Sequence, residues 1–474
     1  MDKFGSISSL SLWFLICIQI LSRPNISFSQ EIDTDAFFIK SIHDKALTDQ
    51  MSYQWLYYLS EKIGGRIAGS PQSMAAIEFT KQILDTLGCT KVFALPTKVN
   101  YWYRGAKEQV RLINHQKFGN VDLNALALGG SGATPATGLS GQVVEFNSIE
   151  EAKKNPALMK GKIVFFSRAF DQKFIRTFHA YGSAVDQRGQ GPNIAAKAGA
   201  IACVVRSMSS RTDDIPHTGA TIFEKDVKPI PAVAISTKAA DLLKSSLMDG
   251  QNATLFIKTS CEARGEKDSY SVIGEIKGTE YPDEIILVGG HLDSWDVGGG
   301  AHDDGAGCVQ SMDVFYLLKQ LNYKPKRTIR CVLFQNEENG LAGGREYARV
   351  SNSNNEFHLA AIESDAGGFS PKGFGFDADT SIIQKYIGNF KEWNSLLEPY
   401  DLNIWKGGGG ADIGPLKSQK GMLFGLSPDS QRYFDYHHTE IDRIDAVHPR
   451  ELALGSAAMT SLVYLIDKYG LAKP

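Results

Sequence analysis

Acidic residues and a histidine stand where apolar segments of this sequence stop. His291 ends an apolar stretch, Asp293 follows two residues later, and Asp303 and Asp304 lie in the glycine-rich loop after it. Imidazole and carboxylate are ligands that zinc takes from proteins. Strand ends and glycine-rich loops are where α/β proteins hold catalytic groups. This segment therefore predicts part of a metal site, provided that further ligands follow.

Further ligand types follow three later apolar segments. Glu337 and Glu338 come after residues 332–336, Asp365 comes after residues 358–362, and His438 comes after residues 433–436. A single pair of this kind is usually a solvated loop. A series of them in order, with spacing that suits alternating strands and helices, favours one cluster at one edge of a sheet. The sequence thus indicates a hydrolase site with two metal ions.

With these motifs the chain resembles the carboxypeptidase Q-like family of secreted zinc exopeptidases, which carry an inserted protease-associated domain. The resemblance covers nearly all of the chain after residue 29. The segments that match, beyond the ligands themselves, include residues 216–219, 290–298, 324–328 and 363–367.

The resemblance implies a cofactor of two Zn²⁺ per protomer and a set of five ligands. Asp303 would bridge both ions. One zinc would also take His291 and Asp365, and the other would take Glu338 and His438. The activity implied is peptide hydrolysis by a hydroxide that the two metals share.

The resemblance also implies roles for residues that do not bind metal. Glu337 would be the general base, and Asp293 would hold the second ring nitrogen of His291, as Asp442 would hold that of His438. The peptide bond between Asp303 and Asp304 would be cis. His302 lies in the bridging loop, at a position where the family has no ligand.

Three residues are candidates for substrate contact. Related aminopeptidases often have a tyrosine, which stabilises the oxyanion, where this chain has His437, with Tyr436 before it; His437 would then take over that task, or would only pack the loop. Asp412 follows a glycine run at 407–410 and is a candidate for binding the free amine of a peptide, although that run could equally be a plain flexible turn.

The pattern of apolar segments predicts an α/β protein with an insertion. After residue 263 apolar strands alternate with helices, as in a mostly parallel sheet covered on both faces, and the resemblance implies a three-layer α/β/α zinc-exopeptidase fold. Strand-like runs without ligand motifs fill residues 131–262. We therefore expect a signal peptide (1–29), an N-terminal part of the peptidase domain (30–130), a β-rich protease-associated insert (131–262) and a catalytic part (263–474).

Composition narrows the function classes. The chain is 43% hydrophobic and 22% charged, with a net charge of -3, which argues against nucleic acid or an anionic membrane as partner. Lys3, an apolar core at 10–21 and a small-residue site at 27–29 predict export, to the periplasm or outside the cell, with no membrane span in the mature chain. The partners expected are a peptide substrate and, from the resemblance, a second copy in a homodimer.

Several functions remain open on the sequence alone. The first expectation is an exported exopeptidase that hydrolyses dipeptides or short peptides. An aminopeptidase of the same fold comes second. A one-zinc glutaminyl cyclase and a receptor-like protein without catalysis are further alternatives, but the complete ligand set and Glu337 count against the receptor.

Overall fold

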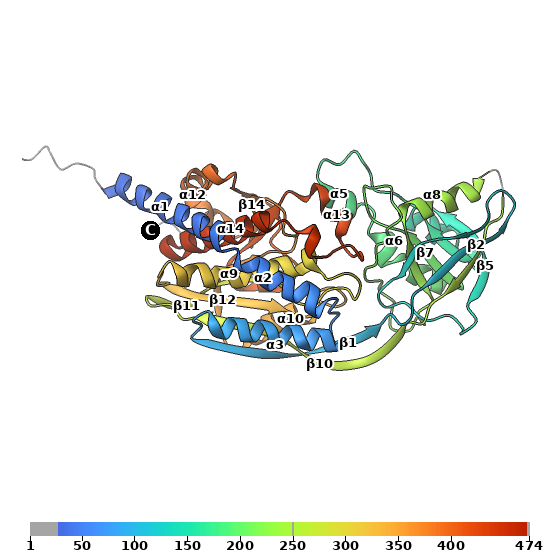
Figure 1. Cartoon of the computed structure of the whole chain (residues 1–474), viewed down its shortest axis with the longest axis horizontal. Helices are drawn as coiled ribbons and strands as arrows, with labels where there is room; N and C mark the ends of the chain where they lie inside the picture. The colour runs from blue at the N-terminus through green and yellow to red at the C-terminus, as the bar shows by residue number, and fades with distance from the viewer. Residues whose placement is uncertain (1–26, 249–250, 472–474) are drawn as a thin grey trace, which may run out of the picture.

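The computed structural model describes residues 27–248 and 251–471 and arranges them around two sheets (Figure 1). Most of the expected signal peptide, residues 1–26, lies outside the described residues. Within the described ranges, no helix is long and apolar enough to cross a membrane.

The first sheet carries the peptidase part. Its strand order is β1-β10-β12-β11-β13-β16-β14-β15. The strands are β1 (Lys91–Tyr103), β10 (Glu262–Ile276), β11 (Tyr281–His291), β12 (Arg327–Phe334), β13 (Phe357–Glu363), β14 (Pro371–Asp377), β15 (Asn403–Lys406) and β16 (Met422–Pro428). The helices are α1 (Ser27–Asp49), α2 (Met51–Tyr57), α3 (Pro71–Thr86), α9 (Ala306–Gln320), α10 (Ala342–Ser353), α11 (Ile383–Tyr386), α12 (Phe390–Leu397), α13 (Tyr433–Tyr436) and α14 (Pro449–Tyr469).

This sheet is mixed: four of its seven neighbouring strand pairs are parallel, among them the central ones. The neighbours β12, β11, β13 and β16 run parallel, whereas β1–β10, β10–β12 and β14–β16 pair antiparallel. The sequence concealed β14 because Gly373 and Gly375 interrupt its apolar pattern, and glycine weakens a strand signal. The parallel centre is the part that holds the predicted ligands.

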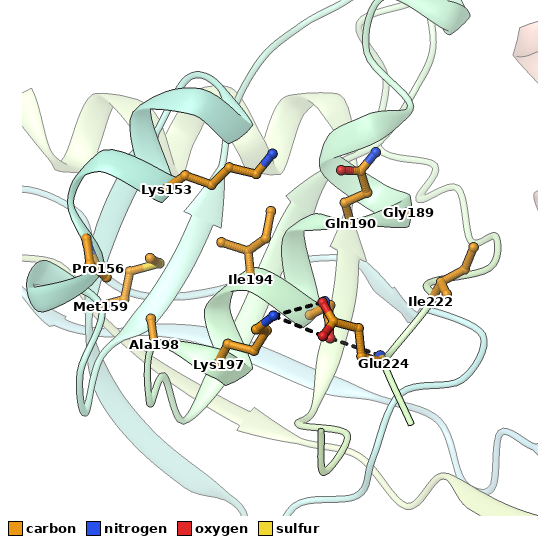
Figure 2. Close-up of a pocket in the computed structure, with 11 residues that line it drawn as sticks. Lys153, Pro156, Met159, Gly189, Gln190, Ile194, Lys197, Ala198, Ile222 and Glu224 are labelled. Atoms are coloured by element: carbon orange, nitrogen blue, oxygen red, sulfur yellow. Dashed lines mark hydrogen bonds and ion pairs between the residues drawn. The ribbon is translucent and has the colours of Figure 1, made fainter. Parts of the chain in front are cut away.

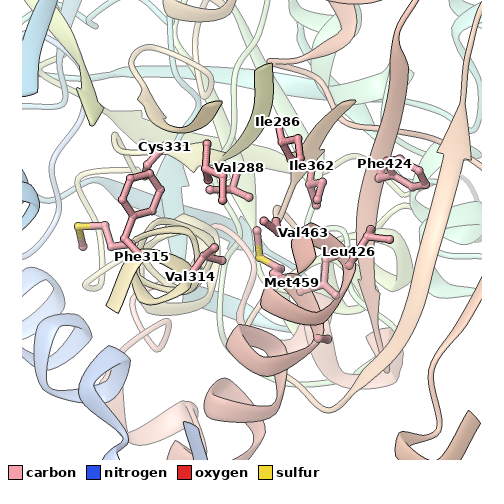
Figure 3. Close-up of a cluster of buried hydrophobic side chains, with 14 of the residues drawn as sticks. Ile286, Val288, Val314, Phe315, Cys331, Ile362, Phe424, Leu426, Met459 and Val463 are labelled. Atoms are coloured by element: carbon pink, nitrogen blue, oxygen red, sulfur yellow. The ribbon is translucent and has the colours of Figure 1, made fainter. Parts of the chain in front are cut away.

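Helices cover both faces of this sheet. Along β11, Ile286 and Val288 face the layer formed by α9 and α14, whereas Leu287 faces the opposite side together with Tyr347 of α10. Figure 3 shows the first of these layers, where Phe315 of α9 and Val463 of α14 meet the strands. Each fully buried side chain of this size contributes about 1.5–3 kcal/mol, so the strand ends rest on a rigid support.

The second sheet belongs to the inserted domain, with order β3-β2-β9-β5-β6-β7-β8-β4. The strands are β2 (Gln109–His115), β3 (Gly119–Asp122), β4 (Ala125–Ala127), β5 (Leu139–Phe146), β6 (Ile163–Phe166), β7 (Ala202–Arg206), β8 (Ala232–Ile235) and β9 (Thr254–Lys258). The helices are α4 (Ile149–Lys154), α5 (Thr177–Gly182), α6 (Asp186–Gly189), α7 (Gly191–Lys197) and α8 (Thr237–Ser246).

The predicted start of the insert at residue 131 is too late. Strand β2 pairs with β9 and strand β4 pairs with β8, so the segment from Gln109 to Ala127 is part of the second sheet. The glycine-rich stretch after residue 129 is a loop inside the inserted domain, where Gly129 bridges to Ala220. The glycine content of this loop indicated a boundary there. The partners of β2 and β4 lie far away in sequence, so no local pattern indicates that these strands belong to the second sheet.

A long ribbon and a buried cluster join the two sheets. Strands β1 and β10 pair from Lys91 to Tyr103 and extend from the peptidase sheet to the insert (Figure 1). Beside them, Trp102 and Trp295 pack in a buried cluster with Ala127 of the insert. Arg104 adds an ion pair, because its Nη2 lies 2.7 Å from the carboxylate of Asp296.

Candidate metal centre

The predicted ligands meet at the carboxyl ends of the parallel strands. His291 is the last residue of β11, Glu338 follows β12, and Asp365 follows β13. Asp303 lies in an irregular turn, Ala301–Gly305, that precedes α9. His438 comes from the loop after α13, at the edge that faces the inserted domain.

Asp303 stands between the two histidines. Its Oδ1 lies 3.3 Å from Nε2 of His291, and its Oδ2 lies 3.2 Å from Nε2 of His438. Nε2 of His291 also lies 3.4 Å from Asp365, and Nε2 of His438 lies 3.0 Å from Glu338. The two oxygens of one carboxylate thus face two separate sets of ligands.

The contacts of Nδ1 in His291 and His438 show which ring nitrogen of each histidine is available for a metal. Nδ1 of His291 is 2.9 Å from the main-chain carbonyl of Asp293, and Nδ1 of His438 is 3.2 Å from the carbonyl of Thr218. A carbonyl only accepts hydrogen bonds, so Nδ1 of His291 carries the hydrogen. Nδ1 of His438 lies between the carbonyl of Thr218 and Nη1 of Arg188, which is 3.4 Å away. Nε2 of each ring then points towards carboxylate oxygens, an arrangement that a cation stabilises.

Two further observations fit zinc. A void of about 10 Å³ adjoins Asp303, Glu338 and His438, and this volume is close to the minimum that a single water-sized sphere occupies. Burial lowers the pKa of His438, but Glu338 and Asp303 outweigh it and raise this pKa to about 10. The carboxylates therefore favour positive charge at Nε2 strongly, and imidazole with carboxylate is a donor set that zinc accepts.

The turn that holds Asp303 is fixed by its neighbours. The carboxylate of Asp442 accepts hydrogen bonds from the main-chain N–H groups of His302 and Asp303, at 2.7 and 3.1 Å. Asp304 accepts from the N–H of His291 at 3.0 Å. The peptide bond between Asp303 and Asp304 is cis, as the resemblance implied.

Two of the predicted orienting contacts differ from the expectation. Asp293 holds His291 through its carbonyl, whereas its carboxylate lies 4.0 Å from Nδ1 and accepts from the N–H of Glu337 at 3.1 Å. Asp442 supports the turn, and the contact that it was expected to make with His438 is made by Thr218. Spacing in sequence cannot show whether a carboxylate or a carbonyl is nearer to a ring.

The other candidates lie around this cluster. Glu337 is half-buried beside it, and burial raises the pKa of its carboxyl well above the usual range. His437 stacks on His438 with ring centres 3.5 Å apart, and its Nε2 lies 3.7 Å from Asp303. His302, predicted not to be a ligand, stacks on Phe369 and directs Nε2 to a carbonyl.

Tyr436 and Asp412 differ in their surroundings. Tyr436 is half-buried against His302. Asp412 is only 1% exposed, and neither carboxylate oxygen has a hydrogen-bond partner among the described residues. Burial, together with the charges of Glu363 and Glu337, raises the pKa of Asp412 well above its usual range. Contact with substrate stays a prediction for both residues.

The glycine run before Asp412 has a defined task. The carboxylate of Glu363 accepts from the N–H groups of Ala411 and Ile413, each at 2.9 Å. A Cβ on Gly410 would lie 2.2 Å from the carboxyl carbon of Glu363. This close approach excludes a side chain at Gly410, and the loop is thereby tied to the end of β13, close to Asp365.

Sequence reasoning missed Arg66, which supports the metal loop. Its side chain is fully buried and donates to three carbonyls: Leu292 at 2.6 Å, Gly299 at 2.7 Å and Gly300 at 3.0 Å. These carbonyls line the segment between His291 and Asp303. The only local signal was that Arg66 lies in a loop with glycines on both sides.

The inserted domain also has a surface depression, of about 540 Å³. Figure 2 shows its lining, with Ile194 and Ile222 and the ion pair between Lys197 and Glu224. None of the predicted site residues lines it. The depression is therefore separate from the metal cluster.

Comparison with known proteins agrees with a metallopeptidase centre. Residues 271–463 match the model of peptidase family M28. The chain is 32% identical to carboxypeptidase Q of Bos taurus over 416 residues, which is 88% of this chain and 85% of that protein. It is also 32% identical to the crystal structure of a peptidase M28 precursor from Shewanella amazonensis, with a TM-score of 0.86 and coverage of 92% and 97%.

A more distant likeness concerns the fold alone. A zinc aminopeptidase from Bacillus subtilis is 20% identical, with a TM-score of 0.62 and coverage of 87% of this chain and 94% of that one. The chain belongs to peptidase family M28, as a zinc peptidase homologous to carboxypeptidase Q.

Proposed function

We propose that this chain is an exported exopeptidase that holds two zinc ions and hydrolyses unblocked dipeptides and short peptides. The observation that carries the proposal is the position of Asp303, whose two oxygens face two separate histidines. A carboxylate in this position can serve two cations at once. The name of the relatives, carboxypeptidase Q, supports action at a chain end.

His291 and Asp365 would hold one ion, Glu338 and His438 the other, and Asp303 both. When bound, the pair of zinc ions supplies Lewis acidity and a water of lowered pKa. Glu337 lies beside the cluster, whereas Nε2 of His291 and of His438 face Asp303, Asp365 and Glu338. The carboxylate of Glu337 is therefore available to accept a proton from water and return it to the leaving amine.

His437 is suited to donate a hydrogen bond to the oxyanion. Burial, and then the neighbouring His438, lower the pKa of His437 well below its usual value, so the ring is neutral. A neutral imidazole retains one N–H, and Nε2 of His437 faces the Asp303 side of the cluster. This role follows from position, and Tyr436 would contribute at the same loop.

A free amine on the substrate fits the surplus of acids. Apart from the five ligands, the carboxyl groups of Glu363 and Asp412 are buried nearby and that of Glu337 is half-buried, and Asp412 has both oxygens free of hydrogen bonds among the residues described. A cationic amine would compensate this charge. Since recognition of an amine alone does not limit peptide length, an aminopeptidase is the second candidate.

Export and the nature of the insert complete the proposal. The signal at residues 1–29 supports export, and the mixed second sheet is the body that we assign to a protease-associated domain. Mass spectrometry of the protein from its native host would show whether the mature chain starts near Gln30. A homodimer is proposed from the resemblance, and sedimentation would measure it.

A substrate panel tests the function. With zinc present, free dipeptides should be cleaved fastest, longer peptides more slowly, and N-acetylated dipeptides least. Preference for longer peptides would favour the aminopeptidase, and rapid cleavage of N-acetylated dipeptides would exclude both candidates. Active protein with one zinc per chain would favour the cyclase-like alternative. As a control, Glu337→Gln should lower kcat about 100-fold or more while two zinc ions remain bound.

A further inference from the structure

The catalytic loop rests on a two-residue segment of the inserted domain. Thr218 donates its main-chain N–H to the carbonyl of His438 at 2.9 Å, and its own carbonyl faces Nδ1 of His438 at 3.2 Å. His217 directs Nδ1 to the carbonyl of His437 at 2.8 Å. The backbone of both histidines and the ring of one are thus held from the other domain.

His217 is built into this place. Its side chain is 3% exposed, and its main-chain N–H donates to Oγ of Ser207 at 2.8 Å, just after β7. Because the carbonyl of His437 only accepts, Nδ1 of His217 carries the hydrogen. Nε2 of His217 is buried and has no hydrogen-bond partner within the described part of the chain.

The loop needs such support. His438 has a φ of 65°, in the left-handed region that residues other than glycine seldom adopt, at a cost of about 1–3 kcal/mol. The bond from His217 fixes the peptide plane between His437 and His438. That plane sets the direction in which the His438 ring leaves the backbone and therefore where its Nε2 lies.

We propose that His217 is a positioning residue of the active site: by holding the carbonyl of His437, it aligns His438 for zinc and His437 for the substrate. The proposal rests on the proposed two-zinc function. Its effect acts through the loop, so binding of zinc should change as well as catalysis.

The test compares three variants at one position. Asparagine places an amide N–H near the position of Nδ1, glutamine places one near Nε2, and leucine has no donor. We expect His217→Leu and His217→Gln to weaken one zinc site by roughly 10–100-fold, as supporting contacts of metal ligands do, and His217→Asn to stay within about threefold of the wild type. His179→Leu, an exposed histidine of the same domain, should have no effect.

Zinc affinity is measured on the full chain by competition with a chromophoric chelator, and kcat and KM with a free dipeptide. The expected kinetic change is a lower kcat in the leucine and glutamine variants with KM within about twofold. If His217→Leu does not fold, the comparison of zinc affinity between His217→Asn and His217→Gln decides. Equal zinc affinities for these two variants overturn the proposal. Zinc titration uses no substrate, so failure of the wild type to cleave dipeptides would refute the proposed function and leave this test intact.

Discussion

Replacement of Arg66 by methionine should weaken the whole metal loop. The guanidinium donates three hydrogen bonds to carbonyls between Leu292 and Gly300, and the side chain is fully buried. Methionine fills a similar volume without donors and leaves three buried carbonyls without that partner. Hydrogen bonds from a charged group contribute about 1.5–3 kcal/mol each, and removal of the buried charge offsets part of the loss. We expect a net loss of about 3–5 kcal/mol.

The measurement is urea unfolding of the zinc-free protein followed by circular dichroism, together with zinc titration of the folded variant. Arg66→Lys keeps the charge but not the planar fork of donors, and should lose about half as much. Arg111→Met is a matched control, because Arg111 is 51% exposed in its ion pair, and it should leave the urea midpoint unchanged. A loss below about 1 kcal/mol in Arg66→Met, with unchanged zinc affinity, would show that Arg66 does not support the loop.

Further predictions concern pH and metal. Burial lowers the pKa of His43, which stacks on Tyr400, to about 4, whereas the unfolded value is near 6.5. The contribution of this histidine to stability is therefore complete above pH 6.5 and is lost as the pH falls towards 4. In urea melts, we expect the free energy of unfolding of His43→Phe, relative to the wild type, to be about 2 kcal/mol higher at pH 5 than at pH 8. Burial raises the pKa of Asp313 to about 6, so the folded state loses stability as the pH rises through 6; Asp313→Asn should raise Tm at pH 8 and not at pH 4, and an equal shift at both would contradict the assignment. Removal of zinc by a chelator should abolish peptidase activity and lower stability by about 2.7 kcal/mol for each of the two sites that zinc fills at 100 times its dissociation constant; a calorimetric scan that is identical with and without zinc would refute a structural contribution of the site.

Much of the site could be predicted because its ligands lie at the ends of strands. Strands β11, β12 and β13 are continuous apolar segments, and parallel strands bring such ends to one edge. The contacts behind the ligands could not be predicted. Thr218 contacts His438 with its own main-chain carbonyl, and Arg66 donates to the main-chain carbonyls of other residues. Since every residue has a main-chain carbonyl, no residue type in the sequence identifies such a contact.

The fold was predictable where periodicity is strong and less so where pairing is distant. The sequence predicts helices over 304–321 and 450–469, and α9 and α14 begin and end within about two residues of these ranges. The sequence also predicts one helix over 380–397, whereas the structure divides this region into α11 and α12. The start of the insert was misplaced because β2 and β4 find their partners more than a hundred residues later.

The place of the insertion has a consequence for how the protein is made. The chain leaves the first sheet after Tyr103 and returns at Glu262, and these two residues pair with each other. At ~5–20 residues per second, a ribosome needs on the order of ten to thirty seconds for residues 104–261 before β10 can join β1. The insert is complete by then, whereas His291 to His438 are still to be synthesised. Thr218 is therefore synthesised before the last metal ligand, so the segment that contacts His438 has time to fold before His438 reaches it.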